Sequence, residues 1–163
     1  MRKYILFSFV LLLFGCNTQN EKPIEKHIDG WKETLVQTAV KARKNAYCPY
    51  SHFQVGSALL TEDGEIFSGV NIENAAYSIT NCAERTALFT SVAAGHQKIK
   101  AIAISAKGIA SPCGACRQAL NEFNPDMIVI LTNENGTHTK ETTLSQLLSY
   151  AFGPKNLEQA TPR

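Results

Sequence analysis

The sequence has no marked excess of charge of either sign, because 16 Lys and Arg residues stand against 14 Asp and Glu residues in a chain of 163. Proteins that bind nucleic acid usually carry a basic stripe or patch, and this composition gives no sign of one. The sequence also contains no internal repeat, and its length suits a single domain. We therefore expect one globular domain that does not bind nucleic acid.

Long hydrophobic runs are missing too, apart from residues 4–14, which are apolar except for one serine. A helix needs about 20 such residues to span a bilayer, so this run is too short. A short apolar stretch after the positive Arg2 and Lys3 is typical of a secretory signal. The run ends in Leu-Phe-Gly-Cys at residues 13–16, which resembles the bacterial lipobox, whose cysteine carries a lipid.

This leader predicts how the chain is divided. Residues 1–15 are expected to be a signal peptide, 16–28 the lipidated Cys16 with a polar tether, 29–157 the folded domain, and 158–163 a C-terminal tail. The protein would then be exported and held in the cell envelope, touching the membrane only through its lipid. A plain signal peptide and a mis-assigned start codon are the alternatives, and the second of these implies a cytoplasmic protein.

Hydrophobic periodicity in the rest of the chain indicates an α/β fold. We expect a helix that Asp29 caps, with a buried face from Trp31 to Val40, and further helices over residues 82–94, 114–123 and 144–149. Strands are expected over residues 53–60, 65–71, 99–105 and 127–132. The first two strands would form a hairpin, and the later alternation of strands and helices implies a partly parallel sheet. The later strands are apolar throughout, so helices should cover both faces of the sheet.

The cysteines supply the first chemical signal. Apart from Cys16, the chain has four, and in an exported protein four cysteines first suggest disulfides. Their spacing favours a metal site instead, because Cys82, Cys113 and Cys116 each lie at or near the start of a predicted helix. Three thiolates on a zinc ion leave its fourth position for water, as a catalytic zinc site requires.

Glu84 lies two residues after Cys82, close to the proposed metal but not counted as a ligand. That position suits a group that moves protons between water and a substrate, as in zinc deaminases. Taken alone, Cys113-x-x-Cys116 is equally typical of a redox motif or of half a structural zinc site. Cys48 is interpreted as an unused thiol. The four histidines fit no metal-ligand spacing: His27, His52, His96 and His138.

The chain resembles the cytidine deaminases, specifically their small homotetrameric class. The likeness runs from about Trp31 to Leu157 and depends on five segments: AYCPYSHFQVG at 46–56, GVNIENAAY at 69–77, the two cysteine segments CAER at 82–85 and PCGACRQ at 112–118, and AFGP at 151–154. It implies a three-layer α/β/α fold with a mixed five-stranded sheet. The implied activity is hydrolytic deamination of cytidine and deoxycytidine to uridine and deoxyuridine, a step of pyrimidine salvage.

The resemblance also implies a role for individual residues. Cys82, Cys113 and Cys116 would bind one Zn²⁺ per subunit, and Glu84 would be the general acid and base. Residues that would contact the nucleoside are Phe53 at the pyrimidine face, Asn71 and Glu73 at the ribose hydroxyls, the backbone at Ala83 on the base edge, and Ala75, Tyr77 and Phe152, which complete the active sites of neighbouring subunits.

Two arginines next to the cysteines extend this scheme. Zn²⁺ and three thiolate ligands together have a formal charge of −1, and this negative charge makes the metal a weaker Lewis acid. Arg85, assisted by Arg117, would withdraw charge from the sulfurs by donating hydrogen bonds to them. Two other functions stay open from the sequence: a deaminase of another cytosine nucleoside, such as an antibiotic, and an exported binding lipoprotein that zinc stabilises.

Overall fold

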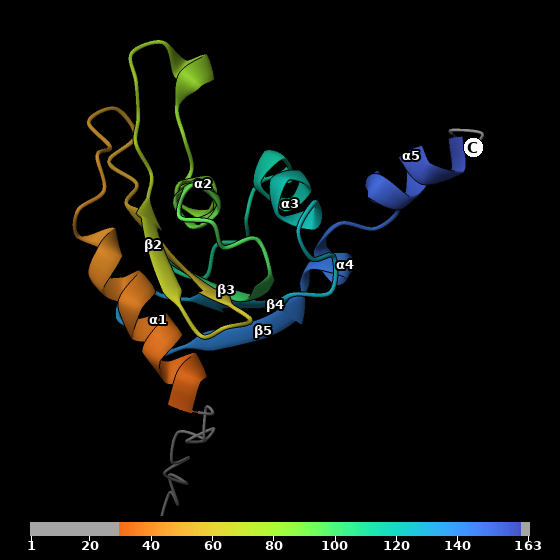
Figure 1. Cartoon of the computed structure of the whole chain (residues 1–163). Helices are drawn as coiled ribbons and strands as arrows, with labels where there is room; N and C mark the ends of the chain where they lie inside the picture. The colour runs from red at the N-terminus through yellow and green to blue at the C-terminus, as the bar shows by residue number, and fades with distance from the viewer. Residues whose placement is uncertain (1–29, 161–163) are drawn as a thin grey trace, which may run out of the picture.

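The computed structural model describes residues 30–160 (Figure 1). The predictions for the signal peptide, for Cys16 and its tether, and for a cap at Asp29 lie outside the described residues. Five strands form one sheet in the order β2-β1-β3-β4-β5. They are β1 (Val55–Thr61), β2 (Ile66–Val70), β3 (Ile99–Ala106), β4 (Ile128–Thr132) and β5 (Thr139–Thr143). Only β3 and β4 run parallel within this sheet, so the expected mixed five-stranded sheet is confirmed.

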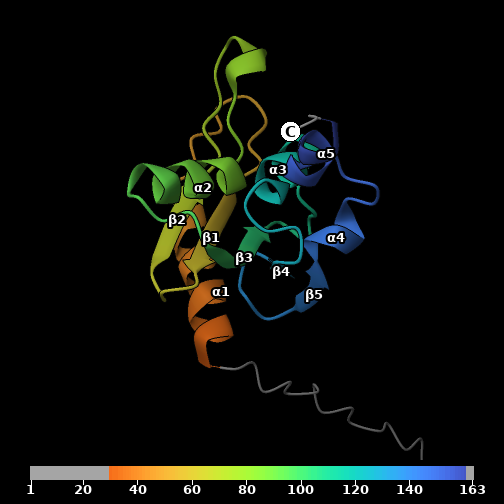
Figure 2. The same cartoon turned by 45° about the vertical axis from the view of Figure 1, so that its right-hand side comes forward.

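Helices cover both faces of the sheet, as expected from its apolar strands (Figures 1 and 2). Helix α1 (Gly30–Arg43) packs Leu35, Val36 and Ala39 against one face. Helices α2 (Ala83–Ala93) and α3 (Gly114–Asn121) pack against the opposite face, together with the short α4 (Leu144–Leu147). Successive residues of a strand point to opposite faces of the sheet and so pack into two separate hydrophobic cores. In β1, Leu59 packs with α2 and Leu60 packs with α1. The three-layer α/β/α fold is therefore confirmed.

Two glycines allow the helices to approach the sheet closely. A Cβ on Gly69 in β2 would lie 2.9 Å from the Ala87 Cα, and closer still to the Ala83 carbonyl oxygen and the Ala87 nitrogen. A Cβ on Gly56 in β1 would lie 2.7 Å from the Arg43 Cα of α1. The contact at Gly69 matters for function, because it sets how closely the first turns of α2 approach the sheet.

Three elements of the structure were not expected from hydrophobic periodicity. Strand β5 is polar and pairs only with β4, so it carries no apolar alternation. A 3-10 helix, η1 (Tyr77–Ile79), lies in the long loop between β2 and α2, and α5 (Pro154–Ala160) extends away from the body of the domain (Figure 1). None of the helices between residues 30 and 160 has the length and apolar character needed to cross a membrane.

The loop between β2 and α2 projects from one end of the sheet, beside the loop that joins α1 to β1 (Figures 1 and 2). Two isolated bridges hold these loops, one between Tyr47 and Ile72 and one between Ile72 and Asn81. The start of α2 lies at the base of the projection, so the two loops border the region of the cysteines.

Candidate zinc centre and active site

Three cysteine sulfurs meet where α2 and α3 begin. The Sγ atoms of Cys82 and Cys113 are 3.9 Å apart, and those of Cys113 and Cys116 are 3.5 Å apart. All three sulfurs lie within 4.8 Å of one another, and no other group of three or more His, Cys, Asp or Glu side chains within residues 30–160 has such an arrangement. The structure therefore brings together the three cysteines that the sequence singled out.

The helix starts explain why the sulfurs converge. Cys82 is the N-cap of α2 and Cys113 is the N-cap of α3, both with extended backbone. Cys116 lies in the first turn of α3 and is fully buried. The unpaired N–H groups and the positive dipole end of a helix favour a thiolate there. Two helices that point their N-termini at one place thus bring the three sulfurs together.

The spacing of the sulfurs fits zinc. With a Zn–S bond of about 2.3 Å and tetrahedral angles, two ligating sulfurs lie about 3.8 Å apart. The separations of 3.9 Å and 3.5 Å agree with that value. They exceed the bond of about 2.05 Å in a disulfide, and the four cysteines in the described part of the chain are free. Three sulfur ligands leave the fourth position open for water.

The pKa values of Cys82 and Cys116 are shifted in opposite directions. Interaction with the Cys116 side chain, followed by contacts from Arg85 and Cys113, lowers the pKa of Cys82 to about 5. The same contact raises the pKa of Cys116, which keeps its proton in the metal-free cluster. Cys82 therefore favours the thiolate form more than Cys116 does.

Glu84 lies in the first turn of α2 and is almost entirely buried. Burial raises the pKa of its carboxyl, and the nearby Cys82 thiolate raises it further. A carboxyl group beside a metal-bound water can act as general base and then as general acid. Its place beside the cluster is the one expected for a proton shuttle.

The two arginines occupy different positions relative to the sulfurs. Arg85 Nη2 donates to the Cys82 Sγ at 3.7 Å and to the Thr80 carbonyl at 3.4 Å. The nitrogens of Arg117 bond elsewhere, to the Pro112 carbonyl at 2.8 Å, the Leu147 carbonyl at 2.6 Å and the Ser111 hydroxyl at 2.9 Å. Arg85 thus contacts a sulfur as anticipated, whereas the contacts of Arg117 hold the backbone around Cys113.

Asn71 and Glu73 hold the loop that leads into β1. The Asn71 side chain accepts a hydrogen bond from the Val55 N–H at 2.8 Å and donates to the Phe53 carbonyl at 2.9 Å. Glu73 accepts from the Ser51 hydroxyl and from the N–H groups of Tyr50 and Ser51. Of these three donors, the Ser51 hydroxyl contributes most to holding the Glu73 pKa below its usual range.

A cleft of about 380 Å³ opens beside Glu73, lined by Tyr50, Ser51, Tyr77 and Thr80. Its volume lies within the range typical of small-molecule sites. Thr80 connects this cleft to the cysteines, because its carbonyl accepts from the same Arg85 nitrogen that donates to Cys82. The cleft is therefore adjacent to the metal cluster.

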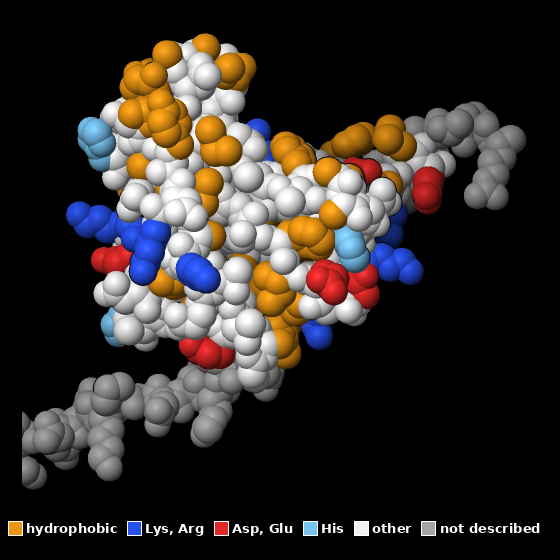
Figure 3. Space-filling model, turned by 60° about the vertical axis from the view of Figure 1, so that its left-hand side comes forward, with side chains coloured by type: hydrophobic (Ala, Val, Ile, Leu, Met, Phe, Trp, Pro, Cys, Tyr) orange, Lys and Arg blue, Asp and Glu red, His pale blue; other side chains and the backbone are white. Residues whose placement is uncertain are grey.

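The apolar residues predicted to contact the nucleoside are exposed. Phe53 is 41% exposed before β1, and Tyr77 is 74% exposed in η1, where its ring meets Tyr50 edge-on. Hydrophobic side chains gather on the projecting loops (Figure 3). Ala75 is exposed on the same projection, whereas the buried Ala83 opens α2, where its N–H has no acceptor within the helix.

Phe152 lies apart from the other predicted residues. It is 59% exposed on the segment between α4 and α5, which lies to the right of α3 in Figure 1, whereas the projecting loops lie to the left. Within one chain the structure does not bring Phe152 to the cleft.

The comparisons with known proteins agree with this geometry. Residues 29–132 match the family model of the cytidine and deoxycytidylate deaminase zinc-binding region. The chain belongs to the cytidine deaminase family. A cytidine deaminase of Sporosarcina psychrophila is 53% identical over 78% of this chain and 96% of its own length. One of Halalkalibacterium halodurans is 48% identical over 77% of this chain and 97% of its own length.

Solved cytidine deaminases share the fold. The enzyme of Burkholderia pseudomallei is 48% identical, and its crystal structure aligns with a TM-score of 0.70 over 73% of this chain and 97% of its own. That of Mycobacterium tuberculosis is 34% identical, with a TM-score of 0.65 over 77% of this chain and 98% of its own. These relatives confirm that the chain is a zinc-dependent deaminase, as the cysteine and glutamate segments predicted.

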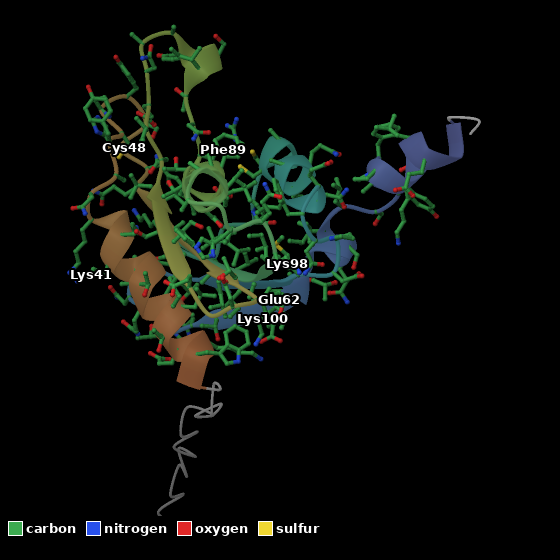
Figure 4. The ribbon with its side chains drawn as sticks, viewed as in Figure 1. Lys41, Cys48, Glu62, Phe89, Lys98 and Lys100 are labelled. Atoms are coloured by element: carbon green, nitrogen blue, oxygen red, sulfur yellow. The ribbon has the colours of Figure 1, made fainter. Side chains whose placement is uncertain are left out.

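Sequence reasoning missed several residues that shape the cytidine deaminase site. Ser51 and Thr80 orient Glu73 and Arg85, and Gln118 and Asn121 bond to the Phe152 carbonyl. Except for Thr80 and Arg85, these partners lie more than 20 residues apart in the chain, so no local pattern identifies them. Cys48 stays without a role, since it lies on the loop after α1, away from α2 and α3 (Figure 4).

Proposed function

We propose that the protein catalyses zinc-dependent hydrolytic deamination of cytidine and deoxycytidine, giving uridine or deoxyuridine and ammonia. The single observation that carries this proposal is the buried Glu84 beside three sulfurs spaced for zinc. A structural zinc site needs no buried carboxyl group. Relatives of up to 53% identity that are named cytidine deaminases support the choice of substrate.

Cys82, Cys113 and Cys116 would hold the zinc ion. A zinc ion in such a site acts as a Lewis acid and lowers the pKa of water. Glu84 would take a proton from the attacking water and deliver it to the ring nitrogen N3, and would then pass a second proton to the departing amino group. The C4–N bond breaks, a C4–O bond forms, and one water is consumed for each ammonia released.

Arg85 would keep the metal reactive. Three thiolates give the zinc site a net negative charge, and the guanidinium contact at 3.7 Å withdraws charge from the Cys82 sulfur. Arg117 would act differently, by fixing the Pro112 carbonyl and with it the position of Cys113.

Asn71 and Glu73 would bind the ribose. The Asn71 amide uses one N–H and its oxygen for the backbone, so one N–H is left for a sugar hydroxyl. The Glu73 carboxylate has lone pairs beyond those that Ser51 and Tyr50 engage. The Ala83 N–H would read the base edge, and the Phe53 ring would pack on the pyrimidine face.

We propose further that the active site is completed in a homotetramer. Its support is the exposure of Tyr77 and Phe152, two large apolar side chains on separate segments of one chain. A neighbouring subunit would bring its Phe152 to this chain's cleft, while Ala75 and Tyr77 of the projecting loop would contribute to the neighbour. Burial of these side chains between subunits would also remove apolar surface from water.

The place of action is a separate proposal. Residues 2–16 support export and a lipid on Cys16, and the cytoplasm is the alternative. No nucleic acid is expected as a partner.

Incubating purified protein with cytidine and following absorbance loss and ammonia release tests the function. Equal amounts of uridine and ammonia, with one zinc per chain, are the expected result. Deoxycytidine and a cytosine nucleoside antibiotic serve as comparison substrates. Turnover of the antibiotic alone, or of no nucleoside at all, would overturn the proposal.

A further inference from the structure

Helix α3 contacts two parts of the protein that have different tasks. Its start supplies Cys113 and Cys116 to the metal cluster. Further along the same helix, the Gln118 Nε2 donates to the Phe152 carbonyl at 2.9 Å, and the Asn121 Nδ2 donates to that carbonyl at 3.2 Å. Two side-chain amides thus bond to the carbonyl of a single residue.

The segment from residue 149 to 160, here called the C-terminal arm, follows α4 and includes α5. Phe152 and the described side chains of α5 are exposed, so core packing does not fix the arm. Gly153 permits the close approach to α3, because a Cβ there would lie 3.1 Å from the Asn121 Nδ2. The two amide bonds therefore hold the Phe152 carbonyl against α3.

A third contact connects the metal loop to the chain that enters the arm. Arg117, next to Cys116 on α3, donates to the carbonyls of Pro112 and Leu147. Pro112 precedes a proposed zinc ligand, and Leu147 is the last residue of α4. Helix α3, which carries two of the metal ligands, is thus hydrogen-bonded both to Leu147, where the chain leaves α4, and to Phe152 in the arm.

We propose that Gln118 and Asn121 are positioning residues that act in a neighbouring active site. They hold the Phe152 backbone, so the zinc-bearing helix of one subunit sets the aromatic ring that completes the site of another. This inference rests on the proposed tetramer with Phe152 acting between subunits. One consequence is that damage to α3 in one subunit lowers substrate affinity in its neighbour.

The first test measures the kinetics of Gln118→Leu/Asn121→Leu. Leucine keeps the bulk and removes both donors, so the arm loses its anchor. Two neutral hydrogen bonds of ordinary strength correspond to a rise in KM of about tenfold. The expected result is this rise with kcat changed less, one zinc per chain and an intact tetramer. Glu122→Gln, an exposed change next to Asn121 that alters neither donor, should leave KM unchanged.

The second test asks whether the effect passes between subunits. Tetramers are assembled from the double variant and from Glu84→Gln chains, which cannot carry out the chemistry but keep an intact arm. Arms of the Glu84→Gln chains are expected to restore a near-normal KM at sites of the double variant. A defect confined to the variant's own helix would not be repaired by its neighbours.

The outcomes separate this inference from the proposed function. Wild-type KM in the double variant, or no restoration in mixed tetramers, overturns the positioning role while deamination stands. A wild-type KM in Phe152→Ala overturns it as well. Absence of turnover in the wild-type protein instead refutes the proposed function. Gln118 is exposed, so Gln118→Ala alone keeps the fold and replaces the double variant if that one is insoluble.

Discussion

Strand β2 meets the active-site helix α2 at Gly69, and Gly69→Ala should damage the metal site without altering any of its residues. The added Cβ would lie 2.9 Å from the Ala87 Cα and closer to the Ala83 carbonyl oxygen, against an ordinary contact of 3.4 Å or more. Neither obstacle is a flexible side chain. Helix α2 must therefore move away from the sheet by about 1 Å to restore normal contacts.

That displacement moves Cys82 and Glu84 relative to the ligands on α3. A misplacement of about 1 Å at a reacting centre costs roughly 10²-fold in rate. We expect Gly69→Ala to reduce kcat/KM by about this factor and to weaken zinc binding. Overpacking should also lower the free energy of unfolding by about 1–3 kcal/mol.

Gly56→Ala is the matched control, since its Cβ would lie 2.7 Å from the Arg43 Cα on the other face of the sheet. It should destabilise the protein to a similar extent while leaving α2 in place. Thermal melting, zinc content and cytidine turnover of the two variants give the comparison. Equal turnover in both variants, at matched loss of stability, would refute the argument that Gly69 sets the position of the catalytic helix.

Three further perturbations have defined expected outcomes. Glu84→Gln should keep zinc and fold but lose roughly 10²–10⁴-fold in kcat, because an amide cannot carry protons; activity within a few-fold of wild type would contradict its role. Chelation of the zinc should abolish turnover. Oxidation of the metal-free protein should then form a disulfide between Cys113 and Cys116. Mass spectrometry would detect this disulfide, and added zinc should restore activity only after treatment with a reductant. A native disulfide between them without zinc would contradict the metal site. Cys16→Ser should move the protein from membrane to soluble fractions at an unchanged rate, whereas unlipidated cytoplasmic wild-type protein would disprove export.

Local patterns predicted the elements whose burial follows a period. The helices at 82–94 and 114–123 and the strands at 99–105 and 127–132 match α2, α3, β3 and β4 to within two residues at each end. Apolar residues repeat there because one stripe or both faces of each element meet the core. The polar β5 and the exposed α5 carry no such repeat, and hydrophobic periodicity missed both.

For the candidate site, too, some features could be predicted from the sequence and others could not. The chemical identity of the cluster follows from the sequence, because three cysteines at helix starts and a nearby glutamate have few other uses. The sequence predicted that Arg85 donates to the sulfurs with help from Arg117, but only Arg85 contacts a sulfur. Their different partners depend on what the fold places nearby: the Cys82 sulfur and Thr80 for Arg85, and the end of α4 for Arg117.

Ligand types and the segments that bear them were thus determined by the sequence alone, since helix caps and thiolate chemistry are local properties. Only the tertiary structure decided the depth of α2 on Gly69, the engagement of Asn71 with the backbone of β1, and the attachment of Phe152 to α3. Each of these depends on atoms more than 10 residues apart in the chain, and sequence periodicity carries no information about such contacts.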